Sequence, residues 1–284
     1  MDQNNNFSPP GFTWFVFSKD RALQLDALLR SLKESVGCVA PCEVLYKATS
    51  DGHLKAYNEV FARHLDLVPR PRCESQFNRD VIDMVSAMGG DHLAFLVDDQ
   101  VFVSPVNLSQ VLAVDPRVAT YSFRLGLRIV RCQPVGDLAC GLPPFIKPEG
   151  LPSEWLAWAW STGKGDWSAR NALDGNVLSR NLVLATLESD SNFQGPQTLE
   201  KVLFASSFCT KFGVCNKHPQ AINLAINRVS SENVIFPHGT LSADNLLQAW
   251  ESGLQANLSI VRTMTPNACH VICDLPFEPR PRKS

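Results

Sequence analysis

Short apolar runs alternate with amphipathic segments along the first part of the chain. Residues 12–17 form a nearly continuous apolar run, which is typical of a strand buried on both faces. The leucines that follow, from Leu23 to Leu32, recur at helical spacing and predict an amphipathic helix. The alternation continues, with strands expected at 42–47 and 93–97 and helices at 54–65 and 77–88.

Strands that alternate with helices predict an α/β fold, in which a mostly parallel central sheet carries helices on both faces. In such sheets, ligands bind beyond the carboxyl ends of the strands. Two polar clusters fall at such ends: residues 18–21 after the first strand and residues 98–100 after the third. Both clusters are therefore expected at the ligand-binding edge of the sheet.

The second half of the chain is less regular. Residues 132–152 are rich in Pro and Gly and predict a long loop. Four of the six tryptophans follow closely, at Trp155, Trp158, Trp160 and Trp167. Helices are expected at 176–187, 198–206 and 242–253, and strand-like segments at 220–229 and 270–275. The polar ends, 1–11 and 276–284, are expected to be flexible tails.

The composition excludes several classes of protein. Hydrophobic residues make up 45% of the chain and charged residues 19%, which is ordinary for a folded protein. The 26 Lys and Arg against 28 Asp and Glu give a formal charge of −2, whereas a general nucleic-acid binder is normally basic. No apolar run of about 18 residues is present, so no membrane-spanning segment is expected. The first residues lack the apolar core of a signal peptide, which favours a cytoplasmic protein.

Nine cysteines raise the question of a zinc site. Two cysteine pairs have the spacing C-x3-C, and two histidines could add nitrogen ligands: Cys38 with Cys42, Cys269 with Cys273, His218 and His270. Zinc sites more often show C-x2-C elements. Free thiols are therefore expected in preference to structural zinc.

Asp98 and Asp99 carry the sharpest chemical signal. Two adjacent acids at the mouth of an apolar strand are costly unless they are solvated or paired. Mn²⁺ or Mg²⁺ is a natural partner, because these cations take oxygen ligands from carboxylates and from substrate phosphates. The pair therefore predicts a metal site that also holds a nucleotide diphosphate. The alternative is that the two acids only turn the chain after the strand.

Six stretches follow one another along the chain in an order that carries a family resemblance. They are FVFSKDRALQL at 15–25, Asn78-Arg79, FLVDDQVF at 95–102, LDGNVLSR at 173–180, GPQTLE at 195–200 and NLAINRV at 223–229. Together they resemble the nucleotide-sugar glycosyltransferases with the GT-A fold, and family 2 in particular, over roughly residues 12–275. The resemblance implies a GT-A fold with a Rossmann-like N-terminal half, in which 12–130 bind the nucleotide sugar and 131–275 bind the acceptor and carry the catalytic residue.

The resemblance also implies roles for single residues. Asp99 would ligate the metal that bridges the two phosphates, and Asp98 would lie near the ribose. The residues implied in nucleotide binding are Ser18, Lys19, Asp20, Arg21, Asn78, Arg79 and Asp98. Many relatives carry a third acid beside the pair, where this chain has Val97 and Gln100. A cation would then bind more weakly before the nucleotide arrives, or would not be needed.

An inverting transferase needs a general base for the acceptor hydroxyl, whereas a retaining one needs no base at that place. The candidates in the second half are Asp166, Asp174, Glu200 and Glu154. We favour Asp174, which precedes a glycine in a stretch that carries the resemblance, although it could equally form an Asx turn or a helix cap.

For the acceptor we name Trp167 and Asp166, because indole faces stack on sugar rings. The alternative for the tryptophans is a buried core, with Trp155 and Trp158 on one helix face. His238 and His270 could each be a late metal ligand, or else ordinary turn and strand residues.

Three functions follow. The first is a glycosyltransferase that moves a sugar from a nucleoside diphosphate, with UDP- or GDP-sugars expected, to a hydroxyl of a glycan, a lipid-linked acceptor or a small molecule. The second is a sugar nucleotidyltransferase, which usually opens with a Gly-rich loop where this chain has Ser-Lys-Asp-Arg. The third is an inactive relative that serves as a binding or scaffold protein. We favour the first.

Overall fold

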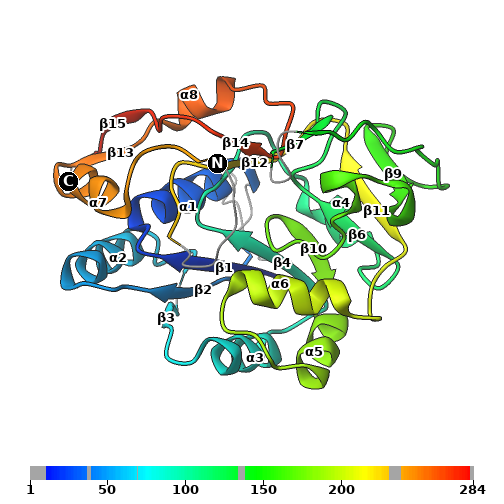
Figure 1. The fold of residues 1–284 in the computed structure, drawn as a ribbon, viewed down its shortest axis with the longest axis horizontal. Helices are drawn as coiled ribbons and strands as arrows, with labels where there is room; N and C mark the ends of the chain where they lie inside the picture. The colour runs from blue at the N-terminus through cyan, green and yellow to red at the C-terminus, as the bar shows by residue number, and fades with distance from the viewer. Residues whose placement is uncertain (1–10, 37–39, 69, 134–137, 230–237, 282–284) are drawn as a thin grey trace, which may run out of the picture.

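The computed structural model describes residues 11–36, 40–68, 70–133, 138–229 and 238–281 (Figure 1). Most of the expected N-terminal tail and Cys38, one member of the first cysteine pair, lie outside these residues. The described chain is a mixed α/β structure built on one large sheet. No helix in the described part is both long enough and apolar enough to cross a membrane.

The central sheet has eight strands in the order β3-β2-β1-β4-β10-β6-β11-β9. Parallel pairing joins β3, β2, β1 and β4, and also β6 and β11, whereas β10 and β9 run antiparallel to their neighbours. The predicted mostly parallel sheet is therefore confirmed. Its strands are β1 (Phe12–Lys19), β2 (Cys42–Lys47), β3 (Arg72–Cys73), β4 (His92–Val97), β6 (Ala119–Ser122), β9 (Trp155–Ala159), β10 (Asn176–Ser179) and β11 (Phe212–Asn216).

Helices cover both faces of this sheet, as Figure 1 shows. The alternation along β1 explains why: Trp14 and Val16 pack on the side of α1, α2 and α7, and Phe15 and Phe17 on the side of α3, α5 and α6. All four side chains are buried, as the apolar run predicts. The helices are α1 (Ala22–Val36), α2 (Asp51–Arg63), α3 (Phe77–Ala87), α4 (Leu108–Leu112), α5 (Arg180–Ser189), α6 (Pro196–Ala205), α7 (Ala243–Glu251) and α8 (Leu258–Thr263).

The helix expected at 176–187 is wrong in its first turn. Residues 176–179 form β10, which pairs with both β4 and β6, and α5 begins only at Arg180. Ladder hydrogen bonds on two sides outweigh a local helical pattern. The Ser179 hydroxyl accepts from the backbone N–H of Leu182 and caps the helix.

Three small sheets complete the fold. They are β14 (His270–Val271), β12 (Ala221–Leu224) and β5 (Gln100–Phe102); β13 (Leu254–Ala256) with β15 (Phe277–Pro279); and β7 (Arg131–Cys132) with β8 (Leu138–Ala139). The C-terminal segment expected to be a tail thus includes β15. Its register on β13 pairs Phe277 with Ala256, and the Arg280 guanidinium lies 3.6 Å from the ring centre of Trp250. Backbone pairing and a cation–π contact hold the segment in place.

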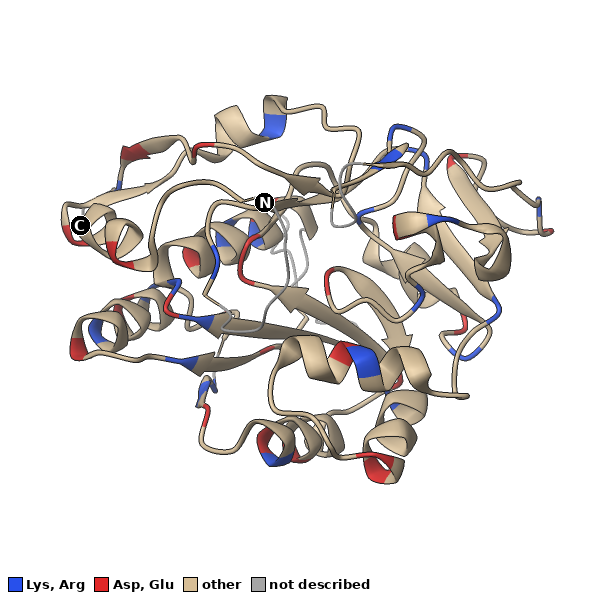
Figure 2. Ribbon diagram, in the orientation of Figure 1, with Lys and Arg blue, Asp and Glu red and all other residues tan. Residues whose placement is uncertain are grey.

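Charged residues are distributed over the helices and loops. Figure 2 shows acidic and basic positions interspersed along the described helices and loops. This distribution agrees with the nearly balanced formal charge of −2.

Candidate functional site

Segments from several strands meet at one edge of the central sheet. From β1 the chain adds β2 and β3 on one side of the sheet, and then returns to add β4 on the other side of β1. The boundary between β1 and β4 is therefore a topological switch point, and ligands bind at such points. Because β10 runs antiparallel to β4, its start lies where β4 ends, and the Gly175 N–H donates to the Phe95 carbonyl at 2.9 Å. Asp98, Asp99 and Asp174 are therefore brought to the same edge.

Asp98 is fully engaged by the turn that follows β1. Its Oδ2 accepts from the Ser18 hydroxyl at 2.8 Å and from the Lys19 N–H at 3.2 Å, and its Oδ1 accepts from Arg21 Nη1 at 3.0 Å. The residue is 3% exposed. Burial raises the pKa of Asp98, and Arg21 opposes that effect. Asp98 therefore links the end of β1 to the turn that follows it, and both of its carboxylate oxygens already accept hydrogen bonds.

Asp20 also serves the turn. Its Oδ1 accepts from the Thr49 N–H at 2.8 Å and its Oδ2 from the Thr49 hydroxyl at 2.9 Å. Its φ of +53° lies in the left-handed region, which Asp tolerates better than most residues. The Tyr57 hydroxyl completes the turn, 2.7 Å from the Ser18 hydroxyl and 3.1 Å from the Arg21 N–H that donates to it. The strand expected at 12–17 extends to Lys19, so Ser18 and Lys19 belong to β1, and only Asp20 and Arg21 form the polar turn after it.

Asp99 differs from Asp98 because part of it remains without a partner. Arg21 Nη1 lies 3.3 Å from Asp99 Oδ2, whereas Asp99 Oδ1 is buried and has no hydrogen-bond partner in the described part of the chain. Burial raises the pKa of Asp99 to about 6; Arg21 and His270 oppose the rise, and the charges of Asp98 and Asp174 add to it. Asp99 therefore shares one electrostatic site with Asp174 and His270.

Asp174 lies at the centre of a second hydrogen-bond network. Its Oδ2 accepts from Arg124 Nη1 at 3.0 Å and from Asn223 Nδ2 at 2.9 Å, and His270 Nε2 lies 3.4 Å away. Its Oδ1 is buried without a partner, as in Asp99. Gly175, with a φ of +98°, makes this arrangement possible, because a Cβ there would lie 2.7 Å from Gln100 Nε2.

Three of the four candidate bases gather around Arg124. Arg124 Nη1 donates to Asp166 at 2.9 Å as well as to Asp174, and the Glu200 Oε1 accepts from the Leu173 N–H at 3.3 Å. Burial raises the pKa of Glu200 to about 7, the nearby Asp174 charge adds to this, and Arg124 opposes it. Glu154, the fourth candidate, is exposed and lies outside this network.

Other predicted residues lie apart from the acids. Asn78 donates to the Ser191 carbonyl at 3.0 Å, and the side chain of Arg79 is exposed. Trp167 belongs to a short 3₁₀-helix, Gly165–Ser168, is 0% exposed, and donates from its indole N–H to the Ile129 carbonyl at 2.7 Å. Neither face of its ring is open to a sugar, because the indole packs against Trp158 and Phe145. The alternative of a buried core describes this residue.

The other tryptophans of the second half are buried too. Trp155 and Trp158 lie in strand β9, not on the helix face that was considered, and both point into the interior. Their side chains lie on opposite faces of the strand, since they contribute to different core clusters. The proposed acceptor site therefore includes none of these tryptophans.

Sequence reasoning missed Arg124, Asn223 and Tyr57. Arg124 follows a short strand with no flanking motif, although its side chain is only 2% exposed. Asn223 lies in the stretch 223–229 that carries the resemblance, so that stretch held a usable signal. Tyr57 falls on an ordinary amphipathic helix, where nothing distinguishes a core residue from one that organises a turn.

The residues fit a divalent cation only in part. Asp99 Oδ1 is a buried oxygen without a partner, and oxygen is the ligand that Mg²⁺ and Mn²⁺ prefer. In the described part of the chain, no group of three or more His, Cys, Asp or Glu side chains could hold a metal ion. Such cations often take one or two carboxylates from a protein and the remaining ligands from phosphates and water. The donor set therefore fits a cation shared with a bound diphosphate.

The remaining histidine and cysteine candidates have other surroundings. His238 is exposed, and its Nδ1 lies 2.8 Å from the carbonyl of its neighbour Gly239. Cys269 is buried and its thiol lies 3.6 Å from the Arg124 carbonyl. Cys269 and Cys273 are both free thiols.

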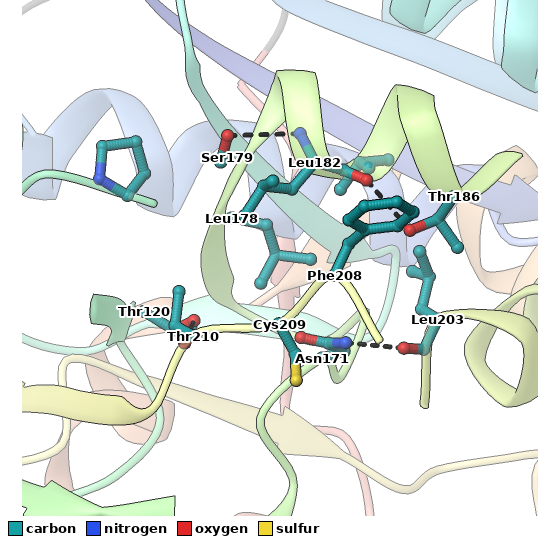
Figure 3. Close-up of a pocket in the computed structure, with 12 residues that line it drawn as sticks. Thr120, Asn171, Leu178, Ser179, Leu182, Thr186, Leu203, Phe208, Cys209 and Thr210 are labelled. Carbon is teal, nitrogen blue, oxygen red and sulfur yellow. Dashed lines mark hydrogen bonds between the residues drawn. The ribbon is translucent and has the colours of Figure 1, made fainter. Parts of the chain in front are cut away.

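A separate shallow pocket lies on the α5 side of the sheet, away from the acids. Figure 3 shows its lining, which includes the Thr120 and Thr210 hydroxyls, 2.8 Å apart, and the exposed ring of Phe208. None of the residues that line it belongs to the network around Asp99 and Asp174. The acidic site therefore does not depend on this pocket.

Comparison with known proteins places the chain as follows. The sequence matches no protein-family model and no curated protein. S. aureus TarS is similar in structure with a TM-score of 0.44 and 10% identity, over 72% of this chain and 35% of that chain. The fragment 1–349 of TarS has a TM-score of 0.44 and 10% identity, over 73% of this chain and 58% of that chain. The apo form of WbbM, a bifunctional glycosyltransferase, has a TM-score of 0.36 and 11% identity, over 73% of this chain and 39% of that chain. The chain thus spans between 35% and 58% of the length of these proteins.

Proposed function

We propose that the chain is a glycosyltransferase with a GT-A fold that moves a sugar from a nucleoside diphosphate to a hydroxyl acceptor. One observation carries the proposal: buried polar atoms that have no hydrogen-bond partner among the described residues concentrate around Asp99 and Asp174 at the edge of the sheet. A buried polar atom left unpaired costs about 1–3 kcal/mol, so such a concentration favours a polar ligand. The atoms are Arg21 Nε, Asp99 Oδ1, Gln100 Nε2, Asp174 Oδ1, Asn223 Oδ1, His270 Nδ1, and Oδ1 and Nδ2 of Asn227.

In this proposal, the donor lies along the ends of β1 and β4. The turn at 18–21, held by Asp98, supports the nucleoside, and the diphosphate lies next to Asp99. UDP- and GDP-sugars are the donors expected first. Asp99 would hold Mn²⁺ or Mg²⁺ together with the phosphates, and such a cation stabilises the negative charge that develops on the leaving diphosphate. Asn78 and Arg79 have no place in this arrangement.

Asp174 is the proposed general base. Its Oδ2 is held by Arg124 and Asn223, which leaves Oδ1 to accept the proton of the acceptor hydroxyl. The acceptor oxygen forms a bond to the anomeric carbon, and the bond from that carbon to the phosphate oxygen breaks. Its electron pair stays on the nucleoside diphosphate. A single displacement of this kind inverts the anomeric configuration.

Asp166 has a supporting role in the same chemistry. It shares Arg124 with Asp174, at 2.9 Å and 3.0 Å from the same Nη1, and so fixes the guanidinium that orients the base. The acceptor is a hydroxyl on a glycan, a lipid-linked carrier or a small molecule.

Release of nucleoside diphosphate tests the proposal. Wild type is incubated with UDP- and GDP-sugars and Mn²⁺, with and without simple sugar alcohols as acceptors. Asp174→Asn is expected to lower the rate by about 10²- to 10⁴-fold, the usual contribution of a general base, while donor binding persists. Glu154→Gln, the exposed candidate, is the matched control. A wild type that releases no diphosphate from any donor contradicts the transferase and favours a binding protein; an unchanged Asp174→Asn contradicts the base.

A further inference from the structure

Arg21 holds both acids of the candidate donor site at once. Its Nη1 lies 3.0 Å from Asp98 Oδ1 and 3.3 Å from Asp99 Oδ2. The side chains are 10%, 4% and 20% exposed, so solvent screens these contacts little. The same guanidinium donates from Nη2 to the Asn227 carbonyl at 2.5 Å, whereas its Nε is buried without a partner.

The charges at this end of the sheet are balanced. Lys19 and Arg21 carry two positive charges, and Asp98 and Asp99 two negative ones. Arg21 contacts both acids, whereas Lys19 Nζ donates to the Val229 carbonyl at 3.3 Å. The neighbouring network adds negative charge, because the two acids Asp166 and Asp174 share one arginine. The nearby Arg228 is exposed, so water and salt weaken its contribution.

This balance disfavours either ligand on its own. A nucleoside diphosphate brings about two negative charges into a site that already has as many acids as bases. A divalent cation meets Asp99 through a carboxylate that Arg21 already neutralises. The complex of the two has almost no net charge, and it offers phosphate oxygens to the guanidinium when the cation takes the carboxylate. Arg21 Nε supplies a donor for that exchange.

We infer that Arg21 couples the binding of cation and donor: it holds Asp99 closed to a lone cation and exchanges that carboxylate for phosphate when both ligands arrive together. This inference rests on the proposed function, because it concerns the same donor site. It assigns Arg21 two roles: it acts on the cation through Asp99, and it binds the phosphate of the donor directly.

Binding measurements in four combinations test the coupling. Titration calorimetry gives the affinity of UDP and GDP in EDTA and in saturating Mn²⁺, and the affinity of Mn²⁺ without and with nucleotide. For wild type, each ligand is expected to raise the affinity of the other by at least about 10-fold, within the usual range of coupling between two ligands. In Arg21→Met, Mn²⁺ alone is expected to bind at least 10-fold more tightly than to wild type, and the coupling is expected to approach 1.

Two further variants keep the inference open to refutation if Arg21→Met does not fold. Asp99→Asn keeps the Arg21–Asp98 pair and is expected to abolish the effect of Mn²⁺ on nucleotide affinity. Arg117→Met removes an arginine that is 64% exposed and paired only with Asp115 among the described ion pairs, and it should match wild type.

The outcomes separate the two proposals. If neither UDP nor GDP binds in any combination, the proposed function fails and the coupling fails with it. If a nucleotide binds within about 3-fold of the same affinity in EDTA and in Mn²⁺, or Mn²⁺ alone binds wild type as tightly as with nucleotide, only the coupling is refuted. Mn²⁺ affinity that is unchanged in a folded Arg21→Met refutes it as well.

Discussion

Asp98 and Asp99 are adjacent in the sequence but are expected to contribute very differently to the stability of the fold. Asp98 accepts three hydrogen bonds, from Ser18, Lys19 and Arg21, and both of its oxygens are used. Asp99 has one contact to Arg21 at 3.3 Å and one oxygen without a partner. We therefore expect Asp98→Asn to destabilise the protein strongly and Asp99→Asn to have little effect.

The magnitude follows from the contacts. In Asp98→Asn the amide NH₂ must face either Arg21 or the Ser18 and Lys19 donors, so at least one buried donor meets another donor. Loss of one partner in a buried ion pair costs about 3–5 kcal/mol. Unfolding entropy of about 2.1 cal/mol/K per residue gives roughly 0.6 kcal/mol/K for the 284 residues, so Tm should fall by about 5–8 °C.

Asp99→Asn removes a charge that burial disfavours. Burial raises the pKa of Asp99 to about 6, above its ordinary value of 3.8, so ionisation of Asp99 costs more in the fold than in the unfolded chain. We expect a change within about 1 kcal/mol, of either sign, because the lost contact to Arg21 offsets part of the gain.

Urea unfolding at pH 7.5, followed by far-UV circular dichroism and by tryptophan fluorescence, gives both values from the shift in midpoint at constant m. Asp83→Asn, at a side chain that is 56% exposed, is the matched surface control. Equal losses for Asp98→Asn and Asp99→Asn, or a larger loss for Asp99→Asn, would refute the assignment of Asp98 as the residue that holds the turn.

Three further predictions concern residues in the second half of the chain. The pKa of Glu200 is about 7 in the fold, above its ordinary value of 4.5, so the fold retains a proton that the unfolded chain releases, and stability falls as pH rises across that interval. Glu200→Gln should therefore be more stable than wild type by about 1–3 kcal/mol at pH 8 and equal to it near pH 4; equal curves at both pH values contradict this. Gly175→Ala, which places a Cβ 2.7 Å from Gln100, should lower Tm and nucleoside diphosphate release together, and an unchanged rate would contradict the role of the turn. Trp167→Phe should lower the free energy of unfolding by about 1–3 kcal/mol without changing the acceptor KM. A raised KM at unchanged stability would show that Trp167 contacts the acceptor.

The sequence predicts the sheet best where an element is short, apolar and bounded by polar residues. The run that becomes β1 and the run that becomes β4 are of this kind, and the acids after β4 could be placed because parallel strands end at a common edge. The sequence does not predict β10, because its four residues are too few to show a strand pattern and a helical pattern follows them directly. Its pairing with β4 and β6 depends on contacts distant in sequence.

The candidate site could likewise be predicted from the sequence only in part. Asp98 and Asp99 could be named from position, but which of them is engaged by the turn depends on the side chains of Ser18 and Arg21 in space. Arg124 gave no signal, because a buried arginine is recognisable only from the acids around it. The sequence favours Trp167 as an acceptor residue because indole faces stack on sugar rings, whereas its large apolar ring is buried in the interior.

The most direct test of the central claim is a crystal structure of the wild type with UDP or GDP and Mn²⁺. The account predicts a diphosphate at the ends of β1 and β4, in contact with Arg21, with the cation on Asp99 and the Asp174 carboxylate facing the vacant sugar position. A nucleotide bound elsewhere, for instance in the pocket beside α5 shown in Figure 3, would contradict the assignment of this edge as the donor site.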